Sequence, residues 1–395
     1  MAVRKRTWKT KAGQPQEAWI VAYVDAQGDR HIRTFERKKD ADAFHASVNV
    51  EVRLGIHTSP SKSPTVGEAA DLYLETCQQE GLERTTLDTY RQHIGLHIVP
   101  FLGAIRLSEL TMPLIRDFID RLRRAGRSPA MVKKILVRLG SVLADAQERG
   151  LLAQNVVRNL KARRRKGRDR QVDARARGKL KVGIDIPTPA EIQDLIPHLR
   201  GRWRPLFLTA IFTGLRASEL RALSWRDVDL KRGELHVHRR ADRYNTFGPP
   251  KSEAGERTIP LPPILLNTLK EHRLASKHDL VFGNGRGNIE NWGNIINRGF
   301  HPAQVAAGIV QAPGRAKYTG LHSLRHFYAS WCINRRADGG LELPLKLVQA
   351  RMGHSSITMT ADTYGHLFPR NDDGSELAAA ERGLHAGPAP NLRVP

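Results

Sequence analysis

The chain has little cysteine and no long apolar run. Of its 395 residues only Cys77 and Cys332 are cysteines, and they lie far apart in the sequence. Two such thiols exclude a disulfide scaffold and a cysteine-rich zinc module, and they indicate a reducing compartment. The chain contains no run of about 18 apolar residues, which is the length needed to span a bilayer. Its basic start RKRTWKTK leads into polar sequence and not into the apolar stretch of a signal peptide. We therefore expect a cytoplasmic protein that makes no membrane contact.

Motifs for ATP-driven and metal-dependent chemistry are also lacking. No GxxxxGK[ST] phosphate loop occurs, which argues against an ATP-driven motor. The C-terminal half has no carboxylate pairs of the kind that two-metal nucleases use. A metal site there would have to use His322 and His326 with His354 or His366, and no HExxH glutamate or acidic cluster accompanies them. We expect neither a metal nor a cofactor.

Positive charge is what the chain has in excess. Its 64 Lys and Arg face 40 Asp and Glu, which gives a formal net charge of +24. Because self-repulsion of this size opposes compaction, the charge indicates a polyanionic partner, and nucleic acid is the first candidate. With 40% hydrophobic residues the chain is no disordered polymer. Its length predicts about two or three globular units.

The N-terminal 58 residues predict a small sheet packed on one helix. A basic stretch and two β-rich runs around a turn at Asp25 to Gly28 precede a segment with helical periodicity. TSPSKSP at 58–64 then breaks every pattern, because each proline disfavours helix in the residue before it. Residues 1–58 are therefore predicted to form a separate domain, followed by a linker.

Residues 65–160 predict a compact four-helix domain. Thr65 with Glu68 forms a capping box at the first helix, and Thr85 with Asp88 offers a weaker box at the second. Thr111 precedes the third helix, and the fourth runs from Pro129 to about Arg149. Residues 188–370 then predict a mixed α/β domain that opens on the capping box of TPAE, and residues 371–395 predict a mobile tail.

Residues 161–187 predict a basic linker between the last two domains. Residues 161–181 hold eleven Lys and Arg and two Asp. A segment of this kind either stays solvated or lies along DNA, where it neutralises several phosphates. The candidate DNA-binding residues of the whole chain are Arg30, Arg33, Lys38, Lys39, Arg121, Lys133, Lys134, Arg163, Arg164, Arg165 and Lys166.

Several side chains of the α/β domain could carry chemistry. Arg216 starts a helix among leucines, so it needs an anionic partner, and Glu219 could be that partner. Lys251 is predicted near a hairpin tip, where a lysine usually serves solubility. His322 and Arg325 project from one face of a helix, and two such donors suit a bound oxyanion, although such a pair can also be purely structural.

The last motif region places a histidine and a tyrosine after a helix stop. Gly353 ends a helix, and His354 just beyond it is expected to be exposed toward a cleft. Tyr364 lies on the short helical stretch that follows. His326 and Tyr328, in the segment LHSLRHFYASW, are assigned to packing or to supporting neighbouring functional side chains.

Five motifs in this order resemble the tyrosine recombinases, and specifically the phage and prophage integrases. They are TGLRASEL, PPKSEAGERTIPL, LHSLRH, MGHSS and DTYGHL. The resemblance implies a multidomain, mainly α fold with an arm-type DNA-binding domain (1–58), a helical core-binding domain (65–160) and an α+β catalytic domain (188–370). Met352 stands where such sequences usually have Leu, and Val156 follows Asn155 where Pro is common. Both departures are apolar and lie away from the chemistry.

The resemblance assigns roles to six residues, all of which match in type: Arg216, Lys251, His322, Arg325, His354 and Tyr364. It implies that Tyr364 is the nucleophile, that Lys251 is the general acid, and that His322 helps in acid–base chemistry. Arg216, Arg325 and His354 would clamp the phosphate. A free phenol is only about 0.1% ionised at neutral pH, so its neighbours must assist its deprotonation.

The implied activity is site-specific DNA recombination through a 3′-phosphotyrosine, without ATP or metal, which integrates or excises a prophage or genomic island. Implied partners are double-stranded DNA attachment sites, further copies of the chain in a tetramer on DNA, a directionality factor and a host DNA-bending protein. The implied place is the nucleoid of a prokaryotic host. A DNA-binding repressor or architectural protein with a vestigial site is an alternative. A chromosome-dimer resolvase and a type IB topoisomerase share the chemistry and are further alternatives.

Overall fold

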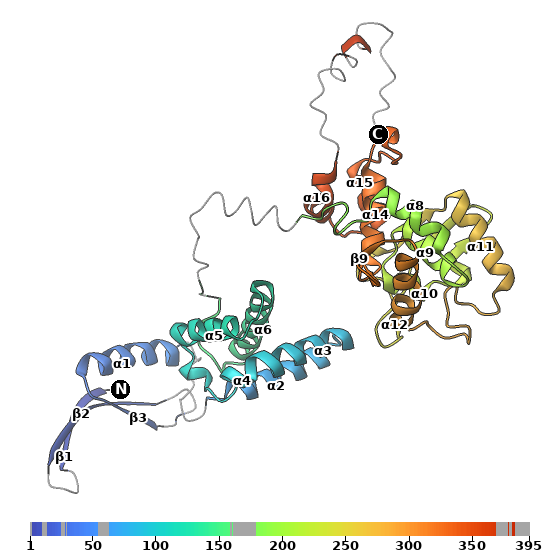
Figure 1. Ribbon diagram of the computed structural model, residues 1–395. Helices are drawn as coiled ribbons and strands as arrows, with labels where there is room; N and C mark the ends of the chain where they lie inside the picture. The colour runs from blue at the N-terminus through green and yellow to red at the C-terminus, as the bar shows by residue number, and fades with distance from the viewer. Residues whose placement is uncertain are drawn as a thin grey trace. The chain divides into compact units, whose positions relative to one another are not determined.

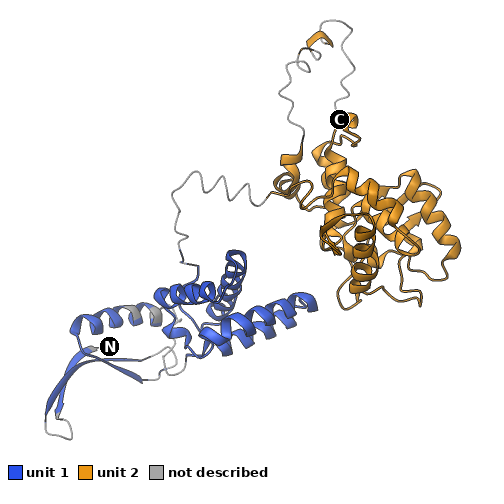
Figure 2. Cartoon of the chain, viewed as in Figure 1, with its two compact units in different colours: residues 1–166 blue, residues 167–395 orange. Residues whose placement is uncertain are grey.

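The computed structural model describes residues 2–9, 14–24, 28, 30–53, 63–158, 160, 179–368, 378 and 381–383. The chain forms two compact units, residues 1–166 and 167–395 (Figure 2). The candidate DNA-binding residues at 163–166, most of the two predicted linkers and nearly all of the predicted tail lie outside the described residues. No helix within the described residues is long and apolar enough to cross a membrane.

The N-terminal part of the first unit is a three-stranded antiparallel sheet with one helix (Figure 1). The strands β1 (Ala2–Lys9), β2 (Pro15–Val24) and β3 (Arg30–Phe35) lie in that order, and α1 spans Lys38–Arg53. Val21 and Tyr23 of β2 alternate toward the helix, where they pack with Ala41 and Val48. The predicted sheet with one helix is confirmed, and the basic start of the chain supplies β1.

The rest of the first unit is helical. Its helices are α2 (Val66–Gln79), α3 (Arg84–His93), α4 (Val99–Leu102), α5 (Met112–Arg124) and α6 (Pro129–Glu148), with a π-helical turn at Ile94–Ile98 and a 3-10 turn at Leu107–Glu109. The capping box of Thr65 and Glu68 is present. The prediction of a capping box at Thr85 and Asp88 was wrong. Helix α3 already begins at Arg84, and its N-cap residue is Glu83, whose side chain makes no capping bond. Thr111 stands at the N-cap of α5, but its side chain makes no capping bond.

The second unit combines helices with short antiparallel sheets. Its helices are α8 (Pro189–Leu195), α9 (Trp203–Thr213), α10 (Ala217–Ala222), α11 (Pro263–Ala275), α12 (Trp292–Asn294), α13 (His301–Ala306), α14 (His322–Ile333), α15 (Leu345–Met352) and α16 (Ile357–Tyr364). Strands β4 (Val228–Asp229), β5 (Glu234–Val237) and β8 (Arg257–Pro260) form one sheet. Two small ribbons pair β6 (Arg240–Ala241) with β7 (Phe247–Gly248), and β9 (Val310–Ala312) with β10 (Arg315–Ala316).

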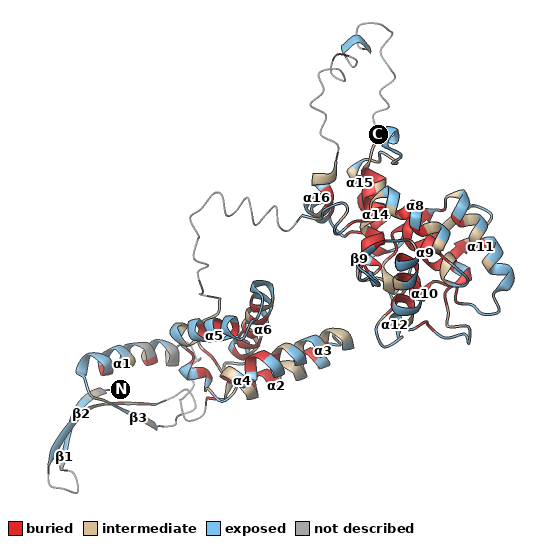
Figure 3. Cartoon of the chain, viewed as in Figure 1, coloured by how far each residue is buried: buried red, intermediate tan, exposed pale blue. Residues whose placement is uncertain are grey.

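Helix α9 is the centre of this unit because it is apolar nearly all round. Its residues from Pro205 to Ile211 are all buried, and α14 packs against it. Figure 3 shows both helices largely buried, whereas α11 exposes one side to solvent. The capping box of Thr188 and Glu191 at the start of α8 is present as predicted.

A second, smaller core joins the last three helices. Tyr328 and Cys332 of α14, Val348 and Met352 of α15, and Tyr364 of α16 pack together with almost no exposure. Helix α15 ends at Gly353, whose φ of +61° is a conformation that suits glycine. This core determines where Tyr364 lies relative to α14.

Candidate active site

Arg216 lies at the N-cap of α10, directly after the turn that ends α9. Gly214 makes this turn with φ of +60°, and a Cβ there would lie 2.4 Å from the ring of Tyr328. Nη1 of Arg216 donates to Oε1 of Glu219 at 2.7 Å, and Nη2 donates to the carbonyl oxygen of Gly353 at 2.8 Å. The anionic partner expected for this arginine is therefore Glu219. The bond to Gly353 holds the same guanidinium next to His354, because Gly353 directly precedes this histidine.

Glu219 serves two arginines. Its side chain is 2% exposed, and Nη2 of Arg257 donates to its Oε2 at 2.9 Å. Burial disfavours the charged carboxylate, but Arg257 and Arg216 outweigh burial and hold the pKa of Glu219 below its usual value. Arg257 was not among the residues predicted from the sequence. The signal that could have found it was its position in β8, two residues before the buried Ile259 and so on the core side of the strand.

Arg325 is the second arginine of the predicted clamp, and it is only 3% exposed. Its two Nη atoms donate to the carbonyl oxygens of Gly214 and Met352. Burial and the nearby Arg216 lower its pKa to about 9, so the guanidinium remains charged at neutral pH. Arg216 and Arg325 thus hold the two consecutive carbonyls that precede His354.

His354 is buried, at 7% exposure, so its expected exposure toward a cleft was wrong. The reason is that α16 folds back over it. The rings of His354 and Tyr364 are nearly parallel, with centroids 6.2 Å apart, and Nδ1 of His354 is 2.9 Å from Oγ1 of Thr360. Burial, Arg325 and Arg216 lower the pKa of His354 to about 4, which makes the ring neutral.

Tyr364 is 1% exposed and its phenolic oxygen contacts a histidine. Oη of Tyr364 is 2.7 Å from Nδ1 of His326. Burial raises the pKa of Tyr364 to about 12, while the positive charges of Arg325 and Arg216 oppose this rise. His326, assigned from the sequence to packing or to a supporting role, therefore contacts the predicted nucleophile directly. Its position four residues after His322, on the same helix face, was the signal that could have found it.

The six predicted residues are not all brought together. Arg216, Arg325, His354 and Tyr364 are linked by the contacts above, and the ring of His322 lies edge-on to that of His326 at 4.6 Å. His322 is exposed at the surface of this cluster, and the protein atoms around it together with Arg325 and Arg216 lower its pKa. Lys251 lies in the loop after β7, exposed, with no hydrogen bond or ion pair to a described residue.

The predicted DNA-binding residues that the structure describes are all exposed: Arg30, Arg33, Lys38, Lys39, Arg121, Lys133 and Lys134. Two of them lie over aromatic rings of the N-terminal domain. The guanidinium of Arg33 is 4.8 Å from the ring centre of Phe44, and Nζ of Lys38 is 5.5 Å from that of Trp19. Their charged ends remain available to solvent.

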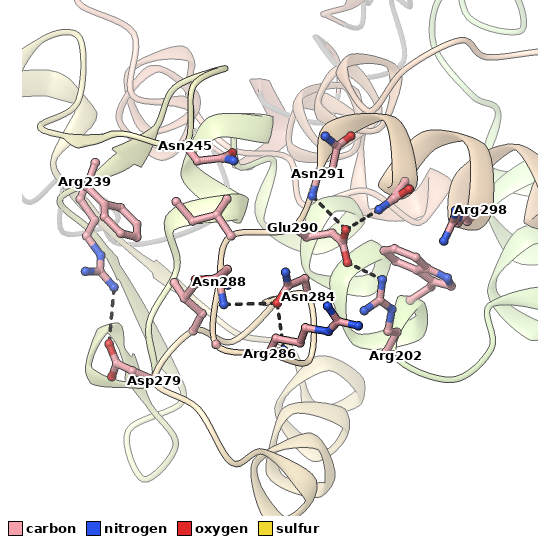
Figure 4. Close-up of a pocket in the computed structure, with 16 residues that line it drawn as sticks. Arg202, Arg239, Asn245, Asp279, Asn284, Arg286, Asn288, Glu290, Asn291 and Arg298 are labelled. Atoms are coloured by element: carbon pink, nitrogen blue, oxygen red, sulfur yellow. Dashed lines mark hydrogen bonds and ion pairs between the residues drawn. The ribbon is translucent and has the colours of Figure 1, made fainter.

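A polar cleft of about 1180 Å³ in the second unit contains none of the six residues (Figure 4). Glu290 is buried in its wall, where it pairs with Arg202 and accepts from Nδ2 of Asn294 at 3.0 Å. Arg221 of α10 donates to the carbonyl oxygen of Glu290 and so connects the cleft to the helix that Arg216 caps. Further lining side chains are Arg239, Arg286, Arg298, Asn245, Asn284 and Asn288.

Two stretches of the chain match known families. Residues 188–370 match the phage integrase family, and residues 65–123 match the SAM-like N-terminal domain of phage integrases. The chain is 26% identical over 362 residues to a XerC-like tyrosine recombinase of Caldanaerobacter subterraneus subsp. tengcongensis, with 84% of this chain and 87% of that protein covered. It is 25% identical over 332 residues to the prophage integrase IntR of Escherichia coli K12, with 76% of each covered.

Solved integrase structures share the fold. The Tn1549 transposon integrase in complex with transposon right-end DNA matches with a TM-score of 0.61 at 18% identity, covering 81% of this chain and 99% of that one. A lambda integrase tetramer bound to a Holliday junction matches with a TM-score of 0.56 at 19% identity, covering 93% and 95%. The chain therefore belongs to the tyrosine recombinases of the phage integrase type. It is a site-specific recombinase, an enzyme that cleaves and rejoins DNA in the integration and excision of mobile elements.

Proposed function

We propose that this recombinase cleaves DNA with Tyr364 and stores the broken linkage as a 3′-phosphotyrosine. The observation that carries the proposal is that both clamp arginines bind the carbonyls of Met352 and Gly353, next to the histidine on which Tyr364 stacks. The phosphotyrosine retains the energy of the phosphodiester. A free 5′ hydroxyl of another duplex can then attack it, so no ATP is needed.

Arg216 and Arg325 are proposed to hold the scissile phosphate. A guanidinium has five N–H donors, and the contacts described above use two on each arginine, so donors remain for phosphate oxygens. Both groups stay protonated while negative charge develops in the transition state. Their bonds to backbone carbonyls fix their planes before the substrate arrives. Each prearranged donor of this kind is worth about 3 kcal/mol in comparable oxyanion sites.

His354 and His322 are proposed to complete the phosphate site. When the hydroxyl of Thr360 donates to Nδ1 of His354, the neutral ring carries its proton on Nε2 and can donate it to a phosphate oxygen. His322 lies exposed one turn before His326, where an imidazole can assist proton transfer. His322 is therefore proposed as an acid–base group.

Lys251 is proposed as the general acid that protonates the leaving 5′ oxygen. Its exposed position in the loop after β7 makes it free to approach bound DNA. Bound DNA would bring the leaving 5′ oxygen within reach of this ammonium group, which can then donate a proton to it.

The DNA partner is proposed to contact the polar cleft as well as the exposed basic residues of the first unit. Guanidinium and amide groups match phosphate oxygens and the edges of guanine and adenine. Replacing Arg286 or Arg298 of the cleft by alanine should weaken DNA binding and reduce the slope of log affinity against log salt by about one for each phosphate that is no longer neutralised. An unchanged slope in both variants would remove the cleft from the interface.

Assembly and location are proposed from the relatives. A lambda integrase tetramer has been solved on a Holliday junction, and this chain shares its fold. We therefore propose a tetramer on paired attachment sites that exchanges strands through a four-way junction. The protein would act at the nucleoid of a prokaryotic cell, with a directionality factor and a DNA-bending protein as candidate partners.

A nicked suicide substrate tests the nucleophile. The wild-type protein should form a covalent adduct with the 3′ side of the nick. Tyr364→Phe should form none and still bind DNA, because it lacks only the attacking oxygen. A persistent adduct would transfer the role to another residue, and absence of any adduct with wild-type protein would favour the repressor alternative.

A second substrate tests the general acid. Lys251→Ala should cleave the normal substrate slowly but recover when the leaving 5′ oxygen is replaced by sulfur, since a thiolate leaves without a proton. Tyr364→Phe is the control that sulfur must not rescue. If sulfur fails to restore cleavage by Lys251→Ala, Lys251 does not supply this proton.

A further inference from the structure

The imidazole that contacts the nucleophile is His326 and not His322. Oη of Tyr364 is 2.7 Å from Nδ1 of His326, which is a full hydrogen bond. The phenol and imidazole rings meet at 61° with centroids 5.7 Å apart, so the contact is made edge to face. A general base must lie within hydrogen-bond reach of the proton it removes, and among the histidines of the described residues only His326 makes such a bond with Oη of Tyr364.

The pair is held in place from both sides. Tyr364 packs in the small core of α14, α15 and α16 and stacks on His354. His326 lies on α14 beside His322, with the two rings nearly perpendicular. Tyr364 cannot leave this hydrogen bond without disturbing its packing, so the position of its phenolic oxygen is fixed by the fold.

His326 also lines an opening to solvent. A cavity of about 280 Å³ is bordered by His326, His322, Asp185, Lys317 and Tyr318, among others. Asp185 is exposed, and its negative charge favours a proton on His326. A cavity of this size holds several water molecules. A proton received by His326 can therefore leave to water in this cavity.

We propose that His326 accepts the phenolic proton of Tyr364 when the strand is cut and passes it to water in the adjacent cavity. The Oη–H bond breaks and the proton moves to Nδ1 as the Oη–P bond forms. The P–O5′ bond breaks, and O5′ takes its proton from Lys251. His326 then releases the proton on Nε2 and returns to the neutral form. Rejoining runs the same transfers backwards. This inference rests on the proposed role of Tyr364.

The charges around the pair keep the proton on the phenol until DNA is present. Burial, His322 and Arg325 lower the pKa of His326 to about 4, with Asp185 acting in the opposite direction. Burial raises the pKa of Tyr364 to about 12. A bound phosphate would oppose the field of Arg325, which raises the proton affinity of His326 and also that of the phenolate of Tyr364. In the free protein the proton therefore stays on the phenol, and no free phenolate forms.

The first test measures adduct formation on the suicide substrate with His326→Ala and His326→Asn. The alanine variant should cleave at least about 100-fold more slowly than wild type, in line with the contribution of a general base. Asparagine places an oxygen near the position of Nδ1 and can hold the phenol, but an amide oxygen does not take up its proton, so this variant should cleave about as slowly as the alanine variant. Both variants should bind the substrate DNA as wild type does, which shows that the unit is folded.

The second test changes the acidity of the nucleophile. A fluorinated tyrosine incorporated at position 364 has a more acidic phenol, so its deprotonation depends less on a base. It should speed cleavage by His326→Ala much more than cleavage by wild type. His322→Ala is the matched control, because His322 lies on the same helix face four residues earlier, and it should gain no such advantage.

Each outcome decides between the two histidines. Wild-type cleavage by His326→Ala, or a slow variant that the fluorinated tyrosine fails to speed, overturns the proposal and leaves His326 a packing role. Rescue of His322→Ala in place of His326→Ala assigns the base to His322. Because wild-type adduct formation is measured in the same assay, failure of this inference is distinct from failure of the Tyr364 assignment.

Discussion

Glu219 is the buried charge on which two arginines depend, and replacing it by glutamine should destabilise the second unit. Arg257 is 5% exposed on its side chain and would lose its only anionic partner among the described residues. Removing one member of a buried ion pair costs about 3–5 kcal/mol, because the other charge stays buried. Arg216 is more exposed, at 31%, and adds less. We expect the free energy of unfolding to fall by about 3 kcal/mol.

Urea unfolding of the second unit, followed by intrinsic fluorescence, measures this loss. Glu191→Gln is the matched control, since Glu191 also closes a capping box and pairs with one cation, Lys317, at 2.6 Å. Its side chain is 18% exposed, so its replacement should cost about 1 kcal/mol or less. Equal losses in the two variants would show that Glu219 is not the buried anchor that we describe.

The effect of Glu219→Gln on the free energy of unfolding should depend on pH in a defined direction. The pKa of Glu219 is lower in the folded protein than in the unfolded chain, so its charge stabilises the fold above the unfolded value of about 4.3. This stabilisation disappears as the pH falls from there through the folded pKa. The unfolding free energies of wild type and Glu219→Gln should therefore differ most near neutral pH and approach each other in acid. A gap that stays constant into acid would contradict the charge argument.

Two further substitutions test local geometry. Gly214→Ala should destabilise the second unit by more than about 2 kcal/mol in thermal unfolding, because a Cβ at φ +60° would overlap the ring of Tyr328; a neutral effect would mean that the turn relaxes freely. Ser128→Ala should lower the free energy of unfolding of the first unit by about 1 kcal/mol, because the Ser128 hydroxyl accepts a hydrogen bond from the N–H of Met131 at the start of α6. A loss below a few tenths of a kcal/mol would mean that water replaces this cap at no cost.

Local signals in the sequence predicted several helix starts and stops and the order of the site motifs. The capping boxes at Thr65 and Thr188 and the helix stop at Gly353 are present in the structure because each depends on residues within one turn of the chain. The same reasoning was wrong at Thr85, where the helix starts one residue earlier. The spacing of His322 and Arg325 also predicted that they lie on one helix, and both lie on α14.

Contacts between distant segments could not be predicted in this way. The burial of His354 depends on α16 folding back, and the bond from His326 to Tyr364 joins two helices through the small core. Arg257 belongs to the site because β8 places it beside Glu219, which lies 38 residues earlier in the sequence. Sequence spacing alone contains none of these distances.

The sequence by itself determined the cationic character of this protein, and residue types and their order along the chain define the predicted six-residue set. Tertiary structure alone decided which groups contact Tyr364 and which charges lie near it. The physical reason is separation along the chain: the guanidinium of Arg216 meets a carbonyl 137 residues later, and that of Arg325 meets one 111 residues earlier. Only the packing of α9, α10, α14, α15 and α16 brings those atoms within bonding distance.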